Sequence, residues 1–305
     1  MRQDNALRVL ISAGASAGHL YPALSLAECI ASRYPRSVIA FVSARRNGIE
    51  NAITGYRLFL LSLRPFRGSL KIILAAAYGF LKSFLEVFFI IEKFRPDVVI
   101  GFGSYVSFPL LLEAALFKKH TIIHEQNVAL GRANKYLSLF VDRIAVSFKE
   151  SEKIKPQCVF TGNPLRSSLV IENRQDAQRF FNFDEKFTIL VVGGSQGSHR
   201  INSVFTRAVP LLEKRTDFQC VHITGGRDFL SLQKSYRYTT IKHRVFDFLP
   251  QMQWAYSAAD LVICRAGAGT ITELAYFRKA AIVIPYPYAG GHQVENARML
   301  AKNKA

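Results

Sequence analysis

Two glycine-rich loops are the segments of this sequence best suited to chemistry on a charged substrate. In residues 7–30, and again in residues 187–212, an apolar run ends in glycines and serines and leads into an amphipathic helix pattern. Gly14 and Gly18 frame the first loop, and Gly193 opens the second. Such loops leave backbone N–H groups at a helix N-terminus, where the helix dipole favours an anion. The repetition predicts two α/β domains that act on a nucleotide-linked substrate.

Polar side chains follow the expected strands of the first half. His19 comes directly after the first glycine loop, where the helix dipole disfavours its cation and suits it to act as a base. Tyr105, within GFGSYVSFP, could offer a hydroxyl to a sugar. The run HEQN, residues 124–127, ends a buried strand with polar residues, which core packing does not explain. Helix capping or packing remains the alternative for His19, and a simple turn for residues 101–109.

The second half carries a further set of polar residues beside glycines. Glu273 follows the small residues of CRAGAGTITELA and is expected on the first turn of a helix, where a carboxylate could accept both ribose hydroxyls. His292 and Gln293 open the last helix and could bind a sugar. The sequence has no Asp-x-Asp pair, so helix termini and an arginine, for which Arg166 is the candidate, would neutralise a diphosphate leaving group. Ordinary helix capping is the alternative for Glu273 and His292.

Composition and charge narrow the class of protein. The chain has 305 residues, half of them apolar, which is enough for two domains with cores of their own. Its four cysteines lack paired spacing, which argues against a zinc site or disulfide framework and fits a reducing cytoplasm. The N-terminus runs straight into the first strand without the pattern of a signal peptide. The net charge of +18 requires an anionic partner. Its basic residues are scattered without interleaved aromatics, so we expect no nucleic acid.

One apolar segment points to a membrane surface. Residues 72–91 are nearly long enough to span a bilayer, but Lys82, Ser83 and Glu86 interrupt them. Basic residues flank the segment on both sides: Arg64, Arg67, Lys71, Lys93 and Arg95. This pattern favours an in-plane surface helix attracted to anionic lipid, and a crossover helix buried against a sheet is the equal alternative. One helix could do both.

Strand and helix patterns alternate along the whole chain. Strands are expected near 8–13, 38–43, 56–61, 97–101, 120–124, 142–146, 187–192, 218–224, 243–246, 260–264 and 281–284. Helices are expected near 18–33, 70–94, 106–117, 131–140, 174–182, 197–214, 251–258, 269–278 and 292–303. Alternation of this kind predicts parallel sheets with helices on both faces, and ligands beyond the carboxyl ends of the strands. The predicted fold class is α/β, with two Rossmann-like doubly wound domains, 1–163 and 164–305, facing a cleft.

Taken together, these segments resemble one family. GFGSYVSFP, HEQNVALGRANK, GNPLR, VVGGSQGS and CRAGAGTITE look like the motif set of the MurG glycosyltransferases, in order along the whole chain. The resemblance implies a GT-B fold with an N-terminal acceptor domain and a C-terminal domain for UDP-N-acetylglucosamine. It further implies an inverting transfer of N-acetylglucosamine to lipid I, forming lipid II by a β-1,4 bond at the cytoplasmic face of the cell membrane. No metal or other cofactor is expected.

The resemblance also implies roles for individual residues. His19 and Glu125 are the expected catalytic residues, and Gly14, Tyr105 and Asn134 the expected acceptor contacts. Ser195 and Arg166 would face the diphosphate, Leu249 and Ala268 the uracil, Glu273 the ribose, and His292 and Gln293 the donor sugar. Ser16, Ala17, Gly18, Asn127, Gly269 and Thr270 complete the expected donor site.

The sequence departs from the family pattern in three places. Ala15 and Ala17 replace glycines of the first loop, and Ser104 replaces the second glycine of a Gly-Gly-Tyr motif. The chain stops at Ala305, where the family continues. This predicts exposed apolar surface on the last strands, a weakened C-terminal domain, and little or no transferase activity.

Three alternatives stay open from the sequence. The chain could bind a nucleotide sugar or a membrane without turnover, or could be another GT-B transferase that makes a glycolipid. A nicotinamide-dependent Rossmann enzyme is disfavoured, because the first loop does not match G-x-G-x-x-G and no acidic residue ends the second strand.

Overall fold

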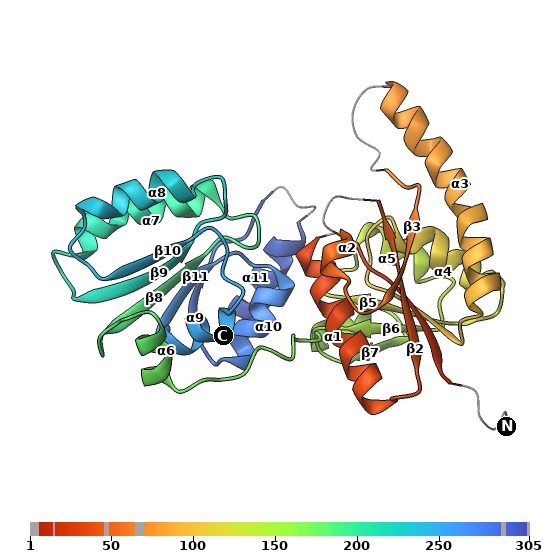
Figure 1. Ribbon diagram of the computed structural model, residues 1–305, viewed down its shortest axis with the longest axis horizontal. Coiled ribbons are helices and arrows are strands. Elements are labelled where there is room, and N and C mark those ends of the chain that lie inside the picture. Colours follow the sequence, from red (N-terminus) through yellow and green to blue (C-terminus); the bar gives the residue numbers. More distant parts are fainter. Residues whose placement is uncertain (1–5, 15, 46–48, 65–69, 288–290, 304–305) are drawn as a thin grey trace. The chain divides into compact units, whose positions relative to one another are not determined.

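The chain folds into two compact units, Met1–Arg166 and Ser167–Ala305. The computed structural model describes residues 6–14, 16–45, 49–64, 70–287 and 291–303 (Figure 1). Each unit is a parallel sheet with helices packed on it, so the predicted α/β class with two doubly wound domains is confirmed. The boundary predicted from the sequence falls between residues 163 and 164, beside the Gly-Asn-Pro turn.

The first unit is built on a seven-stranded sheet. Its strands are β1 (Arg8–Ser12), β2 (Val38–Ala44), β3 (Arg57–Leu61), β4 (Val98–Gly101), β5 (His120–Glu125), β6 (Arg143–Val146) and β7 (Cys158–Phe160), in the order β3-β2-β1-β4-β5-β6-β7. Its helices are α1 (Ala17–Arg33), α2 (Ile49–Ala52), α3 (Leu70–Phe94), α4 (Ser107–Leu116) and α5 (Arg132–Leu137), with a 3₁₀ turn, η1, over Lys149–Ile154. The order reverses at β1 and β4, the strands that lead into the predicted His19 and Tyr105 loops.

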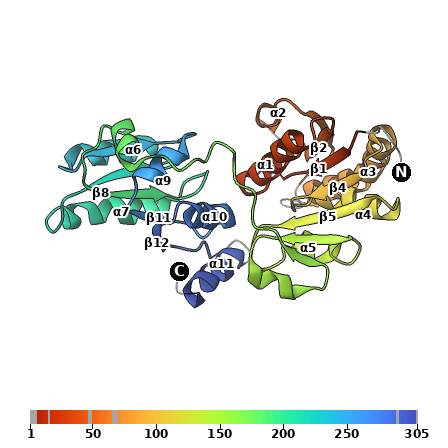
Figure 2. The same ribbon diagram turned by 90° about the horizontal axis from the view of Figure 1, so that it is seen from below.

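Alternation along β1 divides the first core into two layers. Val9 and Ile11 pack with α1 and α2, whereas Leu10 packs with α3, α4 and α5 on the other face. Successive strand residues point to opposite faces, so a buried parallel strand needs apolar residues at every position. Figure 2 shows α1 on one side of these strands and α3 and α4 on the other. The sheet thereby fixes the direction in which each strand end presents its loop.

The second unit has a five-stranded sheet. Its strands are β8 (Phe187–Val192), β9 (Phe218–Ile223), β10 (His243–Phe246), β11 (Leu261–Cys264) and β12 (Ala280–Val283), in the order β10-β9-β8-β11-β12. Its helices are α6 (Arg174–Phe180), α7 (His199–Leu212), α8 (Phe229–Ser235), α9 (Met252–Ala258), α10 (Ala268–Tyr276) and α11 (His292–Lys302), with a 3₁₀ turn, η2, over Tyr236–Tyr238. The order reverses at β8 and β11, which lead into the second glycine loop and the Glu273 helix.

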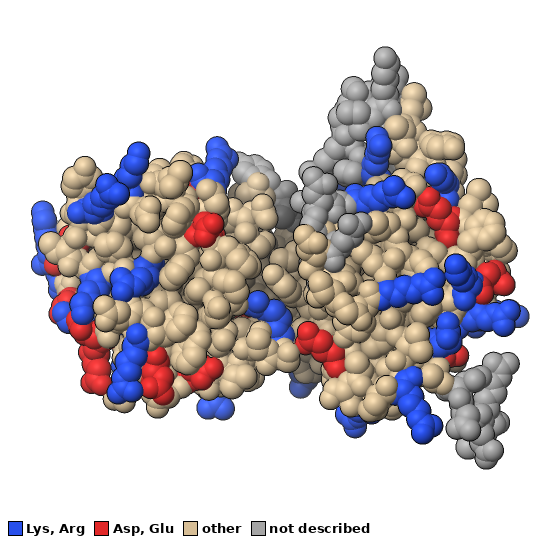
Figure 3. All heavy atoms as spheres, viewed as in Figure 1, with Lys and Arg blue, Asp and Glu red and all other residues tan. Residues whose placement is uncertain are grey.

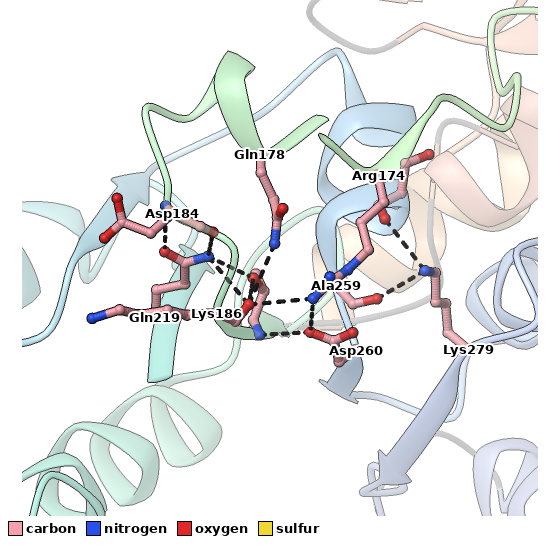
Figure 4. Close-up of polar contacts among 10 residues, drawn as sticks. Arg174, Gln178, Asp184, Lys186, Gln219, Ala259, Asp260 and Lys279 are labelled. Carbon is pink, nitrogen blue, oxygen red and sulfur yellow. Dashed lines mark hydrogen bonds and ion pairs between the residues drawn. The ribbon is translucent and has the colours of Figure 1, made fainter. Parts of the chain in front are cut away.

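A polar cluster closes the amino-terminal edge of the second sheet. Asp260 accepts from the backbone N–H of Thr188 and from the Arg174 guanidinium, each at 2.8 Å, and so joins the starts of β8 and β11 to α6 (Figure 4). Gln219, fully buried, donates to the carbonyl of Asp184 at 2.7 Å. These polar groups form hydrogen bonds with one another, so their role is structural. The residues that could bind a ligand lie at the opposite, carboxyl edge of the sheet.

The structure corrects several details of the predicted elements. The short strand β7 and the helices α2 and α8 were not expected from the sequence, because each is too short to show a period. The helix expected over 131–140 ends at Leu137. The predicted exposure of apolar surface near the last strand is confirmed: Ile282 of the edge strand β12 is 50% exposed and Ile284 is 37% exposed.

Candidate functional site

The first glycine loop places His19 at the start of α1. Ser16 is the N-cap residue, with extended backbone, and Ala17 and Gly18 are the first two helical residues. Ser16 Oγ lies 2.6 Å from His19 Nδ1, while the His19 N–H donates to the Ser16 carbonyl at 3.0 Å. The imidazole is therefore held against its own helix cap in the first turn, as the sequence predicts. Ala15 lies outside the described residues.

The β4–α4 loop packs directly against this histidine. Gly103 has φ +81° and Ser104 has φ +68°, so two successive residues adopt the left-handed conformation that favours glycine. A Cβ placed on buried Gly14 would lie 2.6 Å from Ser104 Cβ, and one on Gly103 would lie 3.5 Å from the His19 ring. The departure from a Gly-Gly-Tyr motif thus falls on a strained position. Tyr105 beside it is 36% exposed and accessible to a ligand.

Glu125 organises the loop that follows β5. The side chain is 2% exposed, and its two oxygens accept four N–H groups. Oε1 accepts from the backbone and side-chain amides of Asn127, at 3.0 and 3.1 Å. Oε2 accepts from the Gly131 backbone and the Asn134 amide, both at 2.8 Å. A carboxylate with this number of donors is a loop anchor, and it orients Asn127 and Asn134. Asn134 Nδ2 would lie 3.6 Å from a Cβ placed on Gly103.

His124, for which the sequence suggested no separate role, ties this loop to the end of the unit. Its Nε2–H donates to the Gly162 carbonyl at 3.1 Å, and its Nδ1 accepts from the Gln126 amide at 3.1 Å. Burial lowers the pKa of His124, so the ring is neutral and one donor and one acceptor suffice. Four residues after Gly162, the Arg166 guanidinium lies 4.8 Å from the Tyr21 ring of α1. Arg166 is therefore fixed near the helix that carries His19.

The second glycine loop exposes Ser195 at its tip. Gly194 has φ +90° and Gly197 has φ +73°, and a Cβ on Gly197 would overlap the Thr224 carbonyl. Only glycine allows this close packing of the loop against the end of β9. Ser198 then caps α7, accepting from the Ile201 N–H. The loop has the form expected of an anion site, as the sequence predicts.

A buried polar network behind this loop was missed from the sequence. His222, fully buried in β9, accepts from the Tyr236 hydroxyl at 2.9 Å and donates to Asn202 Oδ1 at 3.1 Å. Asn202 in turn donates to Asp228 Oδ2 at 2.8 Å, and Asp228 Oδ1 meets His199 Nδ1 at 3.0 Å. Burial lowers the pKa of His222 to about 3, so it stays neutral. The network anchors the start of α7. Its only sign in the sequence is the presence of isolated polar residues in otherwise apolar strands.

The Glu273 helix begins earlier than the sequence suggested. α10 starts at Ala268, so Glu273 is the sixth helical residue, and the first turn of α10 holds no acidic residue. The prediction that Glu273 lies on the first turn is wrong, because five helical residues, 268–272, precede it and complete that turn. Glu273 accepts from the Tyr256 hydroxyl of α9 at 2.7 Å. Its carboxylate is thereby oriented, and the dipole argument for its presence no longer applies.

The remaining predicted donor residues lie at the same edge of the second sheet. Leu249 is 5% exposed and Ala268 is 6% exposed, and both belong to loops or helix starts that follow strands. His292 and Gln293 open α11, as expected, and Gln293 Oε1 accepts from the Tyr286 N–H at 2.9 Å. The structure thus divides the predicted site residues into two groups, residues 14–166 in the first unit and residues 195–293 in the second.

Neither group forms a metal centre within the part of the chain that the structure describes. No cluster of three histidine, cysteine or acidic side chains is present there with the proximity that a metal ion requires. All four cysteines are free thiols, three of them buried. The described residues instead present helix N-termini and glycine loops of the kind that suit anions.

Comparison with known proteins extends this description. Residues 9–146 match the glycosyltransferase family 28 N-terminal domain, and residues 188–305 match the C-terminal domain of the same family. A relative from Thermodesulfovibrio yellowstonii is 39% identical over 98% of this chain and 84% of its own length. One from Syntrophus aciditrophicus is 40% identical over 97% of this chain and 83% of its own length. Both carry the name UDP-N-acetylglucosamine--N-acetylmuramyl-(pentapeptide) pyrophosphoryl-undecaprenol N-acetylglucosamine transferase.

Solved structures agree with the sequence relatives. The crystal structure of Acinetobacter baumannii MurG superposes with a TM-score of 0.75 at 28% identity, covering 98% of this chain and 84% of that one. The glycosyltransferase of kitacinnamycin superposes with a TM-score of 0.71 at 17% identity over 98% of this chain, which shows a shared fold. Since both domains match one family and relatives near 40% identity span the chain, this protein belongs to the MurG family of glycosyltransferases.

Proposed function

We propose that this enzyme moves N-acetylglucosamine from UDP-N-acetylglucosamine to lipid I and so forms lipid II in peptidoglycan synthesis. The observation that carries the proposal is the match of both domains to relatives whose name states this donor and acceptor. The matches span both predicted binding halves, which favours transfer over the alternative of binding without turnover and over the expectation of little or no transferase activity. The HEQN segment, organised around Glu125, favours lipid I over the acceptors of other GT-B glycolipid transferases.

The second unit is suited to hold the donor. Its glycine loop and the start of α10 direct backbone N–H groups toward the carboxyl edge of the sheet, where they can bind a diphosphate. Glu273, oriented by Tyr256, would accept the two ribose hydroxyls. Leu249 and Ala268 would enclose the uracil, Gly269 and Thr270 would approach the phosphates, and His292 and Gln293 would bind the sugar. Donor recognition then depends on loops that all follow β8, β10, β11 or β12.

The first unit is suited to activate the acceptor. Inverting transfer requires a base that removes a proton from the attacking hydroxyl, and His19 is the best-placed group. For Nε2 to accept that proton, Nδ1 must carry a hydrogen and donate it to Ser16 Oγ, 2.6 Å away. Glu125 would act through Asn127 and Asn134, which it orients. Gly14 and Tyr105 would contact the acceptor beside them.

Charge on the leaving diphosphate would be neutralised without a metal ion. The N-termini of α7 and α10 and the side chain of Ser195 would supply positive potential and hydrogen-bond donors from the second unit, and Arg166 would do so from the end of the first. Arg166 stacked on Tyr21 is held in place before the donor arrives. Preorganised donors of this kind stabilise charge that develops in the transition state.

The exposed face of α3 is the proposed contact with an anionic membrane. Its inner face packs Val87, Ile91 and Phe94 into the core. Its outer face presents a stripe of exposed apolar side chains: Leu74, Tyr78, Leu81, Leu85 and Phe89, each at least 60% exposed. The buried inner face agrees with the crossover-helix interpretation, and the exposed stripe supports the proposed surface contact.

Further features of the surface support this contact. At the end of α4, the Phe117 ring lies 5.8 Å from the Phe88 ring of α3, and Leu116 is 72% exposed; an exposed apolar patch is typical of an interaction site. By length and composition alone, Ile73–Phe94 could cross a bilayer. Lys and Arg are spread over the visible faces of both units (Figure 3), and Arg64, Lys93 and Arg95 flank the helix. Arg67 and the side chain of Lys71 lie outside the described residues. We infer a peripheral enzyme at the cytoplasmic face.

Nucleotide specificity tests the donor assignment. Thermal melting with UDP, GDP, ADP and TDP at equal concentration should show the largest rise for UDP, because a ligand that binds only the folded state stabilises it by mass action. NAD should have no effect. An equal rise with all diphosphates would indicate phosphate binding alone and would contradict a uridine site around Leu249 and Ala268.

A further inference from the structure

Arg265 occupies a junction in the second unit that the sequence did not single out. It follows directly after β11 and is half-buried. Its Nη2 donates to Ser198 Oγ at 2.7 Å, and its Nη1 donates to the carbonyls of Ile284 and Pro285, each at 3.3 Å. The guanidinium carbon lies 5.3 Å from the centre of the Tyr286 ring. One side chain thus contacts two segments far apart in sequence.

Both segments belong to the proposed donor site. Ser198 is the N-cap of α7 and the last residue of the glycine loop that presents Ser195. The carbonyls of 284 and 285 lie in the segment that leaves β12, and the next N–H, that of Tyr286, donates to Gln293 Oε1 at 2.9 Å. A continuous path of contacts therefore runs from the glycine loop, through Arg265 and the 284–286 backbone, to Gln293.

The chemistry of the junction requires arginine. A guanidinium offers five N–H groups in a rigid plane, so it can serve three acceptors in two directions and stack on a ring at the same time. Burial lowers the pKa of Arg265 below its ordinary value, but the group stays charged at neutral pH. A lysine would keep the charge, yet its single ammonium cannot span both segments with the same geometry.

We propose that Arg265 is a positioning residue for the donor sugar: it locks the 284–286 segment to the glycine loop and so holds Gln293 at a fixed place relative to the bound diphosphate. This inference rests on the proposed donor, UDP-N-acetylglucosamine. Arg265 acts through Gln293 and makes no contact of its own with the nucleotide. Its loss affects the sugar half of the donor more than the UDP half.

Calorimetric titration of UDP and of UDP-N-acetylglucosamine into wild type and Arg265→Met tests this. We expect Arg265→Met to weaken binding of the nucleotide sugar by about tenfold, the order expected for one lost hydrogen bond, and binding of UDP by less than about threefold. Arg265→Lys should fall between wild type and Arg265→Met. Arg237→Met is the matched control, since Arg237 is exposed on η2, and both its affinities should equal those of wild type.

A double variant and an exchange measurement sharpen the test. Gln293→Ala combined with Arg265→Met should weaken sugar binding no more than Gln293→Ala alone, because both changes remove the same contact. Hydrogen exchange in the peptide around Tyr286 should accelerate in Arg265→Met and in Arg265→Lys, which reports on the lock without any ligand.

Several results would overturn the proposal. Equal weakening of UDP and UDP-N-acetylglucosamine would show a direct phosphate contact by Arg265. Additive effects of Gln293→Ala and Arg265→Met would show that the two residues act independently, and unchanged exchange near Tyr286 would show that no lock exists. A wild-type chain that binds neither nucleotide would overturn the proposed function as well, whereas wild-type binding with an unaltered Arg265→Met variant would overturn only this inference.

Discussion

The proposed activation of the acceptor depends on the pair His19 and Ser16. His19→Ala should lower the rate of transfer by about 10²–10⁴, the usual loss for a general base, and leave UDP binding unchanged. Ser16→Ala should cause a smaller loss, because the imidazole loses the acceptor that keeps hydrogen on Nδ1. Steady-state kinetics with saturating donor would measure both. Turnover within a few-fold of wild type in His19→Ala would return His19 to a packing role and make Glu125 the base to examine.

Glu273 is the residue on which the nucleotide assignment depends. A carboxylate that accepts two ribose hydroxyls makes charge-assisted hydrogen bonds worth roughly 1.5–3 kcal/mol. Glu273→Ala should therefore weaken UDP roughly ten- to a hundredfold. Tyr256→Phe removes the hydroxyl that orients this carboxylate at 2.7 Å and should produce a milder loss. Titration calorimetry of UDP provides the measurement, and equal affinity in wild type and Glu273→Ala would contradict the ribose contact.

Single residues differ in how far the sequence could predict them. His19, Tyr105 and Gln293 lie beside glycines that follow predicted strands. That pattern alone predicted that they lie in loops at the carboxyl edge of a sheet, where a ligand could bind. The roles of His124, His222 and Arg265 could not be predicted in this way. Each acts through a partner 20 to 67 residues away in sequence, such as Gly162, Asn202 or Ser198, and only the folded sheet brings the partners together.

Among the elements, α4 carries a buried acid that gives stability a pH dependence. Glu113 is 8% exposed, and burial raises its pKa from 4.5 to about 7. The folded state favours the protonated form, so this contribution to stability is fully present below pH 4.5 and is lost as pH rises through about 7.

Glu113→Gln keeps a neutral side chain with nearly the shape of the protonated acid and removes the titratable group. Above pH 7 the variant should be more stable than wild type by roughly 1–3 kcal/mol, and near pH 4 the two should be equal. Urea unfolding across this pH range measures the difference. Glu92→Gln, an exposed position at the end of α3, is the control and should show no trend. A pH-independent difference for Glu113→Gln would contradict the buried-acid account.

The bounds of helices and strands were predicted most accurately where the hydrophobic period and the length of the segment were clear. The bounds 70–94 and 187–192 were predicted without error, because a long apolar helix and a fully apolar strand leave little choice. The start of α10 was predicted at residue 269, one residue after the observed Ala268, but Glu273 was wrongly assigned to the first turn, which ends before this sixth helical residue. The sequence also could not show whether α3 is buried or exposed, because one face of the helix packs into the core and the other face is exposed.

At the scale of the whole molecule, the positive charge and the α3 stripe should act together on lipid. Each basic residue near an anionic surface contributes about 1 kcal/mol, and salt screens this attraction. Sedimentation with anionic vesicles should therefore show strong binding at low salt and weaker binding as salt rises, with less binding to neutral vesicles.

The stripe itself can be tested with matched variants. Leu81→Ser with Leu85→Ser removes two side chains that are 68% and 65% exposed on α3. Val204→Ser with Leu211→Ser removes two exposed side chains of α7 and is the control. Only the α3 pair should reduce vesicle binding, since each buried leucine contributes about 1.5–3 kcal/mol. Equal loss in both pairs, or equal binding to neutral and anionic vesicles, would contradict a membrane face on α3.

The most direct test of the account is transfer itself. Purified protein is incubated with labelled UDP-N-acetylglucosamine and a lipid I analogue in anionic vesicles, and the lipid product is separated from free sugar. We expect label in a disaccharide-linked lipid, a product that Glu273→Ala forms poorly at low donor concentration and His19→Ala forms slowly at any concentration. Absence of labelled lipid with the wild-type chain, while UDP still raises its melting temperature, would contradict the proposal that this enzyme makes lipid II.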